Sequence, residues 1–545
     1  MSLSRRRFLG HAAPLGLLPL LEACGADGSE PLEVPPPCCD VEDGDPFQHG
    51  VASGDPLVDA VILWTRVTPT RSEGEATEGT DIEVEWRVST DPELAQVVSF
   101  GTARARASLD FTVKVDATGL AAGTTYYYDF SALGLRSKVG RTRTLPDVSV
   151  EHVRLAVLSC ANFPAGFFNV YRLVAARSDI DLVLHLGDYL YEFPNGTFGD
   201  GAAIGRLPIP DREAISLEDY RQRHAQYKTD PDLQEAHRQH PFIAIWDDHE
   251  VSNNAYRDGA ANHQPDSEGD WLERKAVAMQ AYFEWMPIRS VSGSLDRVYR
   301  EFQFGELLDL ILLDTRFAGR DSRVSGNCDV EGILDSTRSL LGSEQESWFF
   351  DALRRSKARG AHFRLVGQQV MFGQRTNRAD GCISQPDQWD GYAESQTRVL
   401  GLLRDEAIDN VVVLTGDAHS SWAFDLAEDP FDPELYDAAT GAGSRAVEVV
   451  TPGVSSPGPG GSVDELRTAL PHLKFTELTR QGYVLIDVDP ERVRAEWYFA
   501  ASVLERGGGE ELGAAFETRS GENHLRPVEG SSAPKAQPPA PAPAY

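Results

Sequence analysis

The sequence is short of positive charge. Its 545 residues include 51 lysines and arginines against 84 aspartates and glutamates, which gives a net charge of −33 at pH 7. This imbalance argues against non-specific nucleic-acid binding and against docking on an anionic membrane surface, because both of those partners are themselves negative. An acidic chain is compatible with binding hard cations, and solubility alone is the alternative explanation of the charge.

The apolar run near the N-terminus, HAAPLGLLPLL, is too short to span a bilayer permanently. It follows SRRRFLG (Ser4 to Gly10), whose paired arginines before Phe and Leu resemble a twin-arginine export signal. Residues 1–24 are therefore predicted to engage the twin-arginine export machinery and to direct the protein to the periplasm or the cell exterior. LEAC (Leu21 to Cys24) is similar to a lipoprotein cleavage box, although Glu22 is atypical, so a lipid anchor at Cys24 stays open.

Cysteine is also scarce, with six in the chain: Cys24, Cys38, Cys39, Cys160, Cys328 and Cys382. The first lies in the predicted signal, and the adjacent second and third lie in a Pro-rich stretch. Cys328 and Cys382 could pair in an oxidising compartment. Cys160 is then left over directly after a predicted strand, and an unpaired thiol in an exported protein requires another role.

Composition and periodicity divide the rest of the chain into four parts. Residues 25–45 are predicted to be a flexible linker. Residues 46–148 contain short alternating apolar runs separated by turns, which predicts an all-β sandwich of the immunoglobulin or fibronectin type III kind. In residues 149–520 strand-like runs alternate with helical stretches, which predicts a layered α/β domain. Residues 521–545 are rich in Pro and Ala and are predicted to be disordered.

Four apolar runs in the predicted α/β domain end in reactive residues. RLAVLSCAN ends at Cys160 and Asn162, DLVLHLGDYLYE at Asp188 and Tyr191, FIAIWDDHE at Asp248 and His249, and VVVLTGDAH at Asp417 and His419. Ligands of α/β sheets bind beyond the carboxyl ends of the strands, so residues far apart in the sequence can converge there. A cluster of charges at strand ends is tolerable where cations neutralise it.

Each of these residues also has an ordinary structural interpretation. Asp188 and Asp417 could cap helices, Tyr191 could be a packed aromatic, His249 could be a buried and satisfied histidine, and Cys160 could be a small buried hydrophobe. Four independent strand ends that all carry ligand-type residues favour a shared metal site over these separate alternatives.

The same stretches resemble the motifs of calcineurin-like metallophosphoesterases, which are D-x-H, G-D-x-x-D, G-N-H-E and G-H-x-H. Here the corresponding stretches are CAN, GDYLY, DDHE and GDAH, and the residues that depart from the motifs are Cys160, Asn162, Tyr191, Asp248 and Asp417. These departures resemble the alkaline phosphatase D family, as do LLDTRF, WDGY and TPGVSSPG. The resemblance covers about residues 47–500 and implies an N-terminal β-sandwich followed by a metallophosphoesterase domain. A middle histidine ligand has no clear counterpart, since GQQVMFG stands in that region.

The ligand types indicate two different metals. Thiolate and phenolate ligands favour a high-valent, redox-active ion, so Cys160, Asp188, Tyr191 and His419 suit Fe³⁺. Asp188, Asp248 and Asp417 form an oxygen-rich second site that suits Ca²⁺, with Asp188 bridging the two ions. The family resemblance likewise implies iron with calcium, and Zn²⁺ or Mn²⁺ are the alternatives.

The predicted activity is hydrolysis of phosphate monoesters, diesters or both, in which a metal-generated hydroxide attacks phosphorus in line with the leaving oxygen. His249 is predicted to protonate the leaving group or stabilise the transition state, and Asn162 to hydrogen-bond a phosphate oxygen. For Arg316, a structural ion pair with the adjacent Asp314 is favoured over a direct role at the site.

Two other functions stay open. One is a phospholipase D-like phosphodiesterase acting on phospholipids or cell-wall polymers, because family members span monoester and diester substrates. The other is a surface calcium-binding or adhesion module, against which the full set of ligand-type residues argues. The H-x-H-x-D-H motif of zinc β-lactamase-type hydrolases is absent from the sequence. We predict a monomer that takes a small or polymeric phosphate ester and has no nucleic-acid partner.

Overall fold

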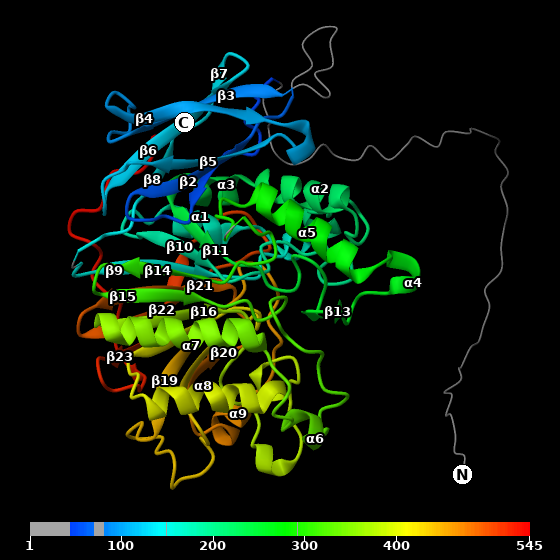
Figure 1. Ribbon diagram of the computed structural model, residues 1–545, viewed down its shortest axis with the longest axis vertical. Coiled ribbons are helices and arrows are strands. Elements are labelled where there is room, and N and C mark those ends of the chain that lie inside the picture. Colours follow the sequence, from blue (N-terminus) through cyan, green and yellow to red (C-terminus); the bar gives the residue numbers. More distant parts are fainter. Residues whose placement is uncertain (1–43, 70–80, 149, 292, 545) are drawn as a thin grey trace, which may run out of the picture. The chain divides into compact units, whose positions relative to one another are not determined.

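The computed structural model describes residues 44–69, 81–148, 150–291 and 293–544 (Figure 1). The predicted signal segment and nearly all of the predicted linker lie outside these ranges, as do Cys24, Cys38 and Cys39. The described residues of both predicted domains belong to one structural unit, Cys39–Tyr545. Among the described residues, no helix combines the length and the apolar character that crossing a bilayer requires.

Two large sheets carry the α/β part of the molecule. The first has ten strands in the order β24 (Arg526–Pro527), β23 (Glu510–Arg519), β22 (Arg492–Ala500), β21 (Gly482–Asp489), β9 (Val153–Leu158), β10 (Leu182–His185), β11 (Pro241–Ala244), β1 (Val51–Gly54), β2 (Ala60–Arg66) and β5 (Thr112–Thr118). The second has seven strands in the order β14 (Arg300–Phe304), β15 (Leu308–Leu312), β16 (Phe363–Gln368), β17 (Val411–Thr415), β19 (Ser444–Val450), β18 (Ser421–Ala427) and β20 (Leu473–Glu477).

Helices and smaller sheets complete the described chain. The helices are α1 (Asn169–Ala175), α2 (Leu217–Lys228), α3 (Pro231–Gln239), α4 (Pro265–Glu268), α5 (Trp271–Trp285), α6 (Val330–Ile333), α7 (Gly342–Arg359), α8 (Ala393–Asp405) and α9 (Val463–Ala469). A further sheet consists of β4 (Val97–Ala105), β3 (Ile82–Ser89), β6 (Thr125–Ala132), β7 (Leu135–Arg136) and β8 (Gly140–Arg143), and a small ribbon of β12 (Ala255–Tyr256) and β13 (Gly259–Ala260). α2 begins directly after Ser216, because Ser216 and Asp219 form a reciprocal capping box.

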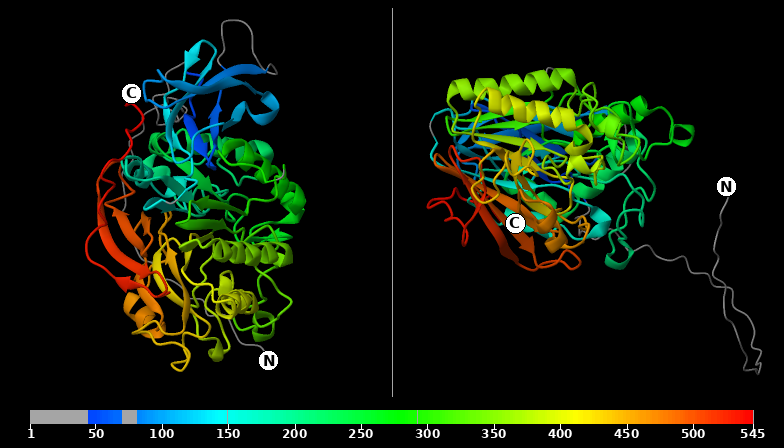
Figure 2. Two further views of the ribbon diagram at one scale, coloured as in Figure 1. Left: turned by 60° about the vertical axis from the view of Figure 1, so that its left-hand side comes forward. Right: turned by 90° about the horizontal axis from the view of Figure 1, so that it is seen from below.

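Alternating residues of the central strands face two different cores. In β17, Val412 and Leu414 join the core shared with the ten-stranded sheet, whereas Val411 and Val413 join the core under α7 and α8. This period-two alternation between two apolar environments explains why the strands read as continuous hydrophobic runs. Figure 1 shows α7 and α8 alongside the seven-stranded sheet, and the second view of Figure 2 shows the same helices from below. The predicted layered α/β arrangement is confirmed.

The predicted N-terminal sandwich is also present, but one of its sheets is part of the ten-stranded sheet. β1 pairs in parallel with β11, with Gly54 opposite Phe242, and so joins β1, β2 and β5 to the α/β part. The strands β3, β4, β6 and β8 form the facing layer. The sandwich core between the layers includes Val61, Leu63 and Val84. The apolar runs of residues 46–148 thus fold as predicted. The sequence pattern changes near residue 149, but this point does not separate two independent sheets.

The described cysteines are either paired or buried. Cys328 and Cys382 form a disulfide, and Cys160 is buried with a free thiol. Residues 521–544, predicted to be disordered, instead lie against the protein: β24 pairs with β23, and Ala542 is buried. The composition of this tail does not reveal the hydrogen-bond donors elsewhere in the chain that hold it.

Candidate metal centre

The predicted residues converge at the carboxyl ends of β9, β10, β11 and β17. Cys160 follows β9 by two residues, Asp188 follows β10 by three, and Asp417 follows β17 by two. Since β9, β10 and β11 are parallel neighbours, their ends meet at one edge of the sheet. β17, in the facing sheet, brings Asp417 and His419 to the same place.

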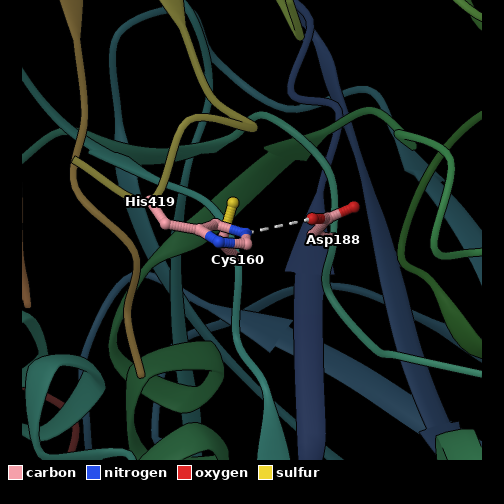
Figure 3. A group of neighbouring side chains, drawn as sticks. All are labelled: Cys160, Asp188 and His419. Atoms are coloured by element: carbon pink, nitrogen blue, oxygen red, sulfur yellow. Dashed lines mark ion pairs between the residues drawn. The ribbon is translucent and has the colours of Figure 1, made fainter. Parts of the chain in front are cut away.

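A first group of side chains consists of Cys160, Asp188 and His419. The thiol, a carboxylate oxygen and an imidazole nitrogen lie within 4.8 Å of one another (Figure 3). Tyr191 completes the group, because its hydroxyl donates to Asp188 Oδ2 at 2.8 Å and lies 2.9 Å from His419 Nε2. Ser456 Oγ donates to the same hydroxyl at 2.8 Å and fixes the phenol ring. The four residues predicted for iron therefore lie together.

Two further groups adjoin the first. Asp188, Asp248 and His249 have ligand atoms within 4.8 Å of one another, and so do Asp247, Asp248 and Asp417. Asp188 thus belongs to two groups and Asp248 to two, so the three groups adjoin one another, whereas no group among the described residues contains both Asp188 and Asp417. Asp247 was not among the residues predicted from the sequence, although it stands directly beside Asp248.

The backbone at the ligand residues is in a sparsely populated conformation. Cys160, Asp188, Asp417 and His419 all have positive φ, between 52° and 61°. Each such residue costs on the order of 1–3 kcal/mol, and such residues persist at functional sites where the surroundings hold them. Gly187 permits the turn before Asp188: its φ is 100°, and a Cβ there would lie 2.4 Å from the Cβ of Asp247.

Glu250 is the side chain that fixes these turns, and the sequence analysis assigned it no role. Its Oε2 accepts the backbone N–H groups of Asp188 at 3.0 Å and Asp247 at 2.8 Å, and its Oε1 accepts that of Tyr189 at 2.6 Å. One buried carboxylate therefore ties the turn after β10 to the turn after β11. The signal for it was the run DDHE itself, whose last residue corresponds to the Glu of the G-N-H-E motif.

Arg316 lies among the carboxylates of the second group. Its guanidinium is fully buried, donates to Asp417 Oδ1 at 2.8 Å and to Asp247, and lies 3.4 Å from Asp248 Oδ1. It also pairs with Asp387 at 2.7 Å. The predicted partner Asp314 is wrong, because Asp314 Oδ1 accepts the backbone N–H of Arg316 and not its guanidinium.

Two buried carboxylate oxygens of the site lack a hydrogen-bond donor among the described residues. Asp188 Oδ1 is buried and has no hydrogen-bond partner among the described residues, although its Oδ2 is hydrogen-bonded. Asp248 Oδ1 likewise lacks a hydrogen bond within the described part of the chain. Buried carboxylate oxygens without partners are costly unless they are neutralised, so the donor set fits bound cations.

Burial and charge set the pKa values of these groups. Burial raises the pKa of Asp188, but the imidazoles of His249 and His419 outweigh burial and lower it to about 2. Burial raises the pKa of Asp248 to about 6 against the opposing charge of Arg316. Burial and the charge of Asp188 raise the pKa values of Cys160 and Tyr191 well above their usual range. Since thiolate and phenolate ligands must lose a proton, metal binding here is expected to release protons.

Removing metal should therefore expose a pH-dependent instability. With a folded-state pKa of about 6 against 3.8 when unfolded, Asp248 favours the fold below pH 4 and opposes it as the pH rises through 6. In chelator-treated protein, Asp248→Asn should leave Tm unchanged near pH 4 and raise stability at pH 7 by roughly 1–3 kcal/mol. Thermal unfolding across this pH range measures the difference in stability. An Asp248→Asn protein no more stable than native protein at pH 7 would refute the destabilising role of Asp248.

His249 and Asn162 lie beside the ligands. His249 Nδ1 is 2.7 Å from Glu192 Oε2; burial lowers the pKa of His249, but Glu192 and the neighbouring aspartates raise it well above 6.5. The amide of Asn162 donates to the carbonyl of Phe198. The Phe198 ring lies 5.4 Å from that of His419 and 6.4 Å from that of His249. Neither Glu192 nor Phe198 was predicted.

Two packed sheets with helices outside, and thiol, phenol, imidazole and carboxylate groups where their parallel strands end, define a metal-dependent hydrolase. Comparison with known proteins specifies it further. The chain belongs to the PhoD-like phosphatase family: the model of that family matches residues 155–497, and the model of the PhoD-like phosphatase N-terminal domain matches residues 37–146. The chain is accordingly a phosphoric ester hydrolase, and the family expected from its motifs is confirmed.

Two relatives show how far the likeness extends. Alkaline phosphatase D of Bacillus subtilis (strain 168) is 36% identical over 504 residues, which is 89% of this chain and 83% of the relative. A solved structure described as "Structure of PhoD" is 34% identical and superposes with a TM-score of 0.81 over 90% of this chain and 93% of the other. The matched ranges of the two family models cover the sandwich and the strands that carry the candidate metal centre.

Proposed function

We propose that the protein is an exported, metal-dependent phosphoesterase that hydrolyses phosphate monoesters, diesters or both, as an alkaline phosphatase D-like enzyme. The observation that carries this proposal is the pair of adjoining groups that share Asp188, whose buried Oδ1 lacks a partner among the described residues. A panel of aryl and alkyl phosphate monoesters and diesters tests it on metal-loaded protein. Turnover of either class that chelation abolishes supports the proposal, and inactivity on every ester in the loaded state contradicts it.

The residues of the centre also support a choice of metals. Cys160, Asp188, Tyr191 and His419 would hold Fe³⁺. Asp188, Asp248 and Asp417 would hold Ca²⁺, where Asp248 shares one group with Asp188 and another with Asp417. Zn²⁺ and Mn²⁺ are the less favoured ions. Bound cations would neutralise the clustered carboxylates, attract phosphate oxygens and lower the pKa of water to near neutrality.

The chain's own residues would then complete the reaction. His249 keeps its Nδ1 proton on Glu192, which leaves Nε2 to donate a proton to the leaving oxygen. Asn162 has one amide proton on Phe198, which leaves a second for a phosphate oxygen. The Phe198 ring lies near the rings of Tyr191, His249 and His419, where it would exclude water from the reacting atoms.

Glu192→Gln tests the positioning of His249. Without the carboxylate, the imidazolium loses its strongest partner and the pKa of His249 falls, so the alkaline limb of the kcat/KM profile should move to lower pH. We expect kcat to fall by about 10–100-fold, as is usual when the group that orients an essential imidazole is removed, with little change in KM. A uniform loss at all pH values, with the limb in place, would show that Glu192 only supports the fold.

Export and localisation to the periplasm or cell exterior form part of the proposal. The disulfide between Cys328 and Cys382 supports it, because such bonds persist in oxidising compartments. Replacing Arg5 and Arg6 by lysine should leave the protein in the cytoplasm, as measured by cell fractionation. Unchanged localisation of that variant would exclude the twin-arginine route. Whether Cys24 carries a lipid is read from the mass of the exported protein.

A further inference from the structure

The segment 531–544 has an unusual backbone chemistry. It contains five prolines, Pro534, Pro538, Pro539, Pro541 and Pro543. Proline has no backbone N–H, so such a segment forms neither a helix nor a sheet ladder and offers its partners mainly carbonyl oxygens. A surface that binds it must therefore supply hydrogen-bond donors.

The protein supplies such donors along the whole segment. Tyr127 Oη donates to the Ala540 carbonyl at 2.7 Å, Arg154 Nη1 to that of Ala533 at 3.2 Å, and Arg238 Nη1 to that of Pro543 at 2.8 Å. Arg141 Nη1 lies 3.4 Å from the Pro539 carbonyl oxygen and 3.5 Å from that of Ala540. Gln239 pairs with both groups of one residue: it donates to the Ala542 carbonyl and accepts the Ala542 N–H at 2.9 Å.

With the segment in place, these donors are enclosed. Tyr127, Arg141, Arg154, Arg238 and Gln239 are all buried, with at most 6% of each residue exposed. Burial lowers the pKa of Arg141 to about 10. Buried donors left without acceptors are costly, so the carbonyls of the segment complete the hydrogen bonding of this surface.

The segment also presents a consistent inner face. The residues with reduced exposure are Ser532, Lys535, Pro539, Ala542 and Pro543. The first four follow one another at intervals of three, four and three. A polyproline II helix has three residues per turn, so every third residue lies on one side. A bend at residues 536–537 accounts for the single interval of four.

Charge and direct side-chain contacts fix the register of the segment. The ammonium of Lys535 pairs with the carboxylate of Asp181, which also faces Arg143 at 3.2 Å. Arg154 Nη2 donates to Ser532 Oγ at 2.9 Å. A Pro/Ala-rich peptide with its single lysine elsewhere would lose the pair with Asp181.

We propose that Tyr127, Arg141, Arg154, Asp181, Arg238 and Gln239 form a binding groove for an extended Pro/Ala-rich peptide with one lysine, occupied by residues 531–544 of the same chain. Tyr127 and Arg141 lie on β6 and β8 of the sandwich, while Arg154 lies on β9 and Gln239 on α3 of the α/β part. The bound segment thus fastens the sandwich to the rest of the molecule. In the first view of Figure 2, the red C-terminal chain runs from the C-terminal strands to the sandwich.

Trypsin offers a direct test on the full-length chain. Beyond Arg526, which precedes Pro527, the sequence has one cleavable bond, after Lys535. The rate at which residues 536–545 are lost, followed by intact mass, reports opening of the groove. We expect the native protein to be cut at least tenfold more slowly than the urea-unfolded chain, since cleavage needs a locally opened segment. The double variant Tyr127→Phe, Gln239→Leu should be cut roughly tenfold faster than native protein.

A matched control separates the groove from a general loss of stability. Tyr299→Phe removes a hydroxyl that donates to Glu344 at 3.2 Å, away from the groove, and should leave the cleavage rate unchanged. Phosphoesterase activity should be the same in all three proteins, because no groove residue is among the proposed ligands. A native tail cut as fast as the unfolded chain, or a double variant no faster than the control, would overturn the proposal. Protection that disappears on dilution would assign the bound segment to a second copy and equally overturn it.

Discussion

Asp188→Asn is expected to eliminate activity and the binding of both metals. Asp188 belongs to two of the three ligand groups, its Oδ2 accepts from Tyr191, and its Oδ1 has no partner in the described part of the chain. An amide has the same shape but no charge, so neither ion keeps its bridging ligand. The transition state would lose several kcal/mol of electrostatic stabilisation. This loss corresponds to roughly a 10³-fold or greater fall in kcat/KM.

Asp179→Asn is the matched control for Asp188→Asn. Asp179 is also largely buried and pairs with Arg154, but it lies outside the three ligand groups. Elemental analysis and kcat/KM of both variants should show loss of metal and turnover at Asp188 alone. Full turnover of Asp188→Asn with both ions retained would refute the bridging role, whereas an unfolded Asp188→Asn protein, detected by circular dichroism, would require Asp188→Glu in its place.

Arg316→Met is expected to have the largest effect on stability. The guanidinium is fully buried and faces four carboxylates, those of Asp247, Asp248, Asp387 and Asp417. Removing one partner of a buried ionic cluster typically costs about 3–5 kcal/mol, because the remaining charges are left without compensation. Urea unfolding of chelator-treated protein measures this loss directly.

The metal dependence of that loss distinguishes the centre from an ordinary ion pair. Added Ca²⁺ should recover a larger share of stability in Arg316→Met than in native protein, since the ion compensates the same carboxylates. Arg316→Lys keeps the charge but loses the planar set of donors, so it should fall between the two. Equal stability of Arg316→Met and native protein without metal would contradict the role assigned to this residue.

The candidate ligands that directly follow a strand could be predicted from the sequence. Cys160, Asp188, Asp417 and His419 were found because the carboxyl ends of buried strands meet, and because thiol and imidazole groups are rare there without a purpose. Asp248 was found in the same way and Asp247 was not, since neighbours on an extended chain point to opposite sides. Beyond Ala244 the chain is no longer a strand, so both carboxylates reach the centre.

The features that the sequence does not predict depend on contacts between segments that lie far apart in the chain. Arg316 was assigned its sequence neighbour Asp314, whereas its partners come from three other loops. Glu192 and Phe198 carry no motif, and only the fold brings them to His249. The sandwich was visible as alternating runs, but its continuity with the α/β part depends on the pairing of β1 with β11, which no local pattern encodes.

The central claim is that Cys160 and Tyr191 bind a redox-active metal beside a hard cation. The most direct test is the visible absorption spectrum of the purified protein, recorded together with elemental metal analysis. We predict iron and calcium, with a charge-transfer band that Tyr191→Phe shifts or abolishes while the protein stays folded. A colourless native protein that carries only zinc or manganese would contradict the mixed-metal centre, although hydrolysis of phosphate esters could survive that result.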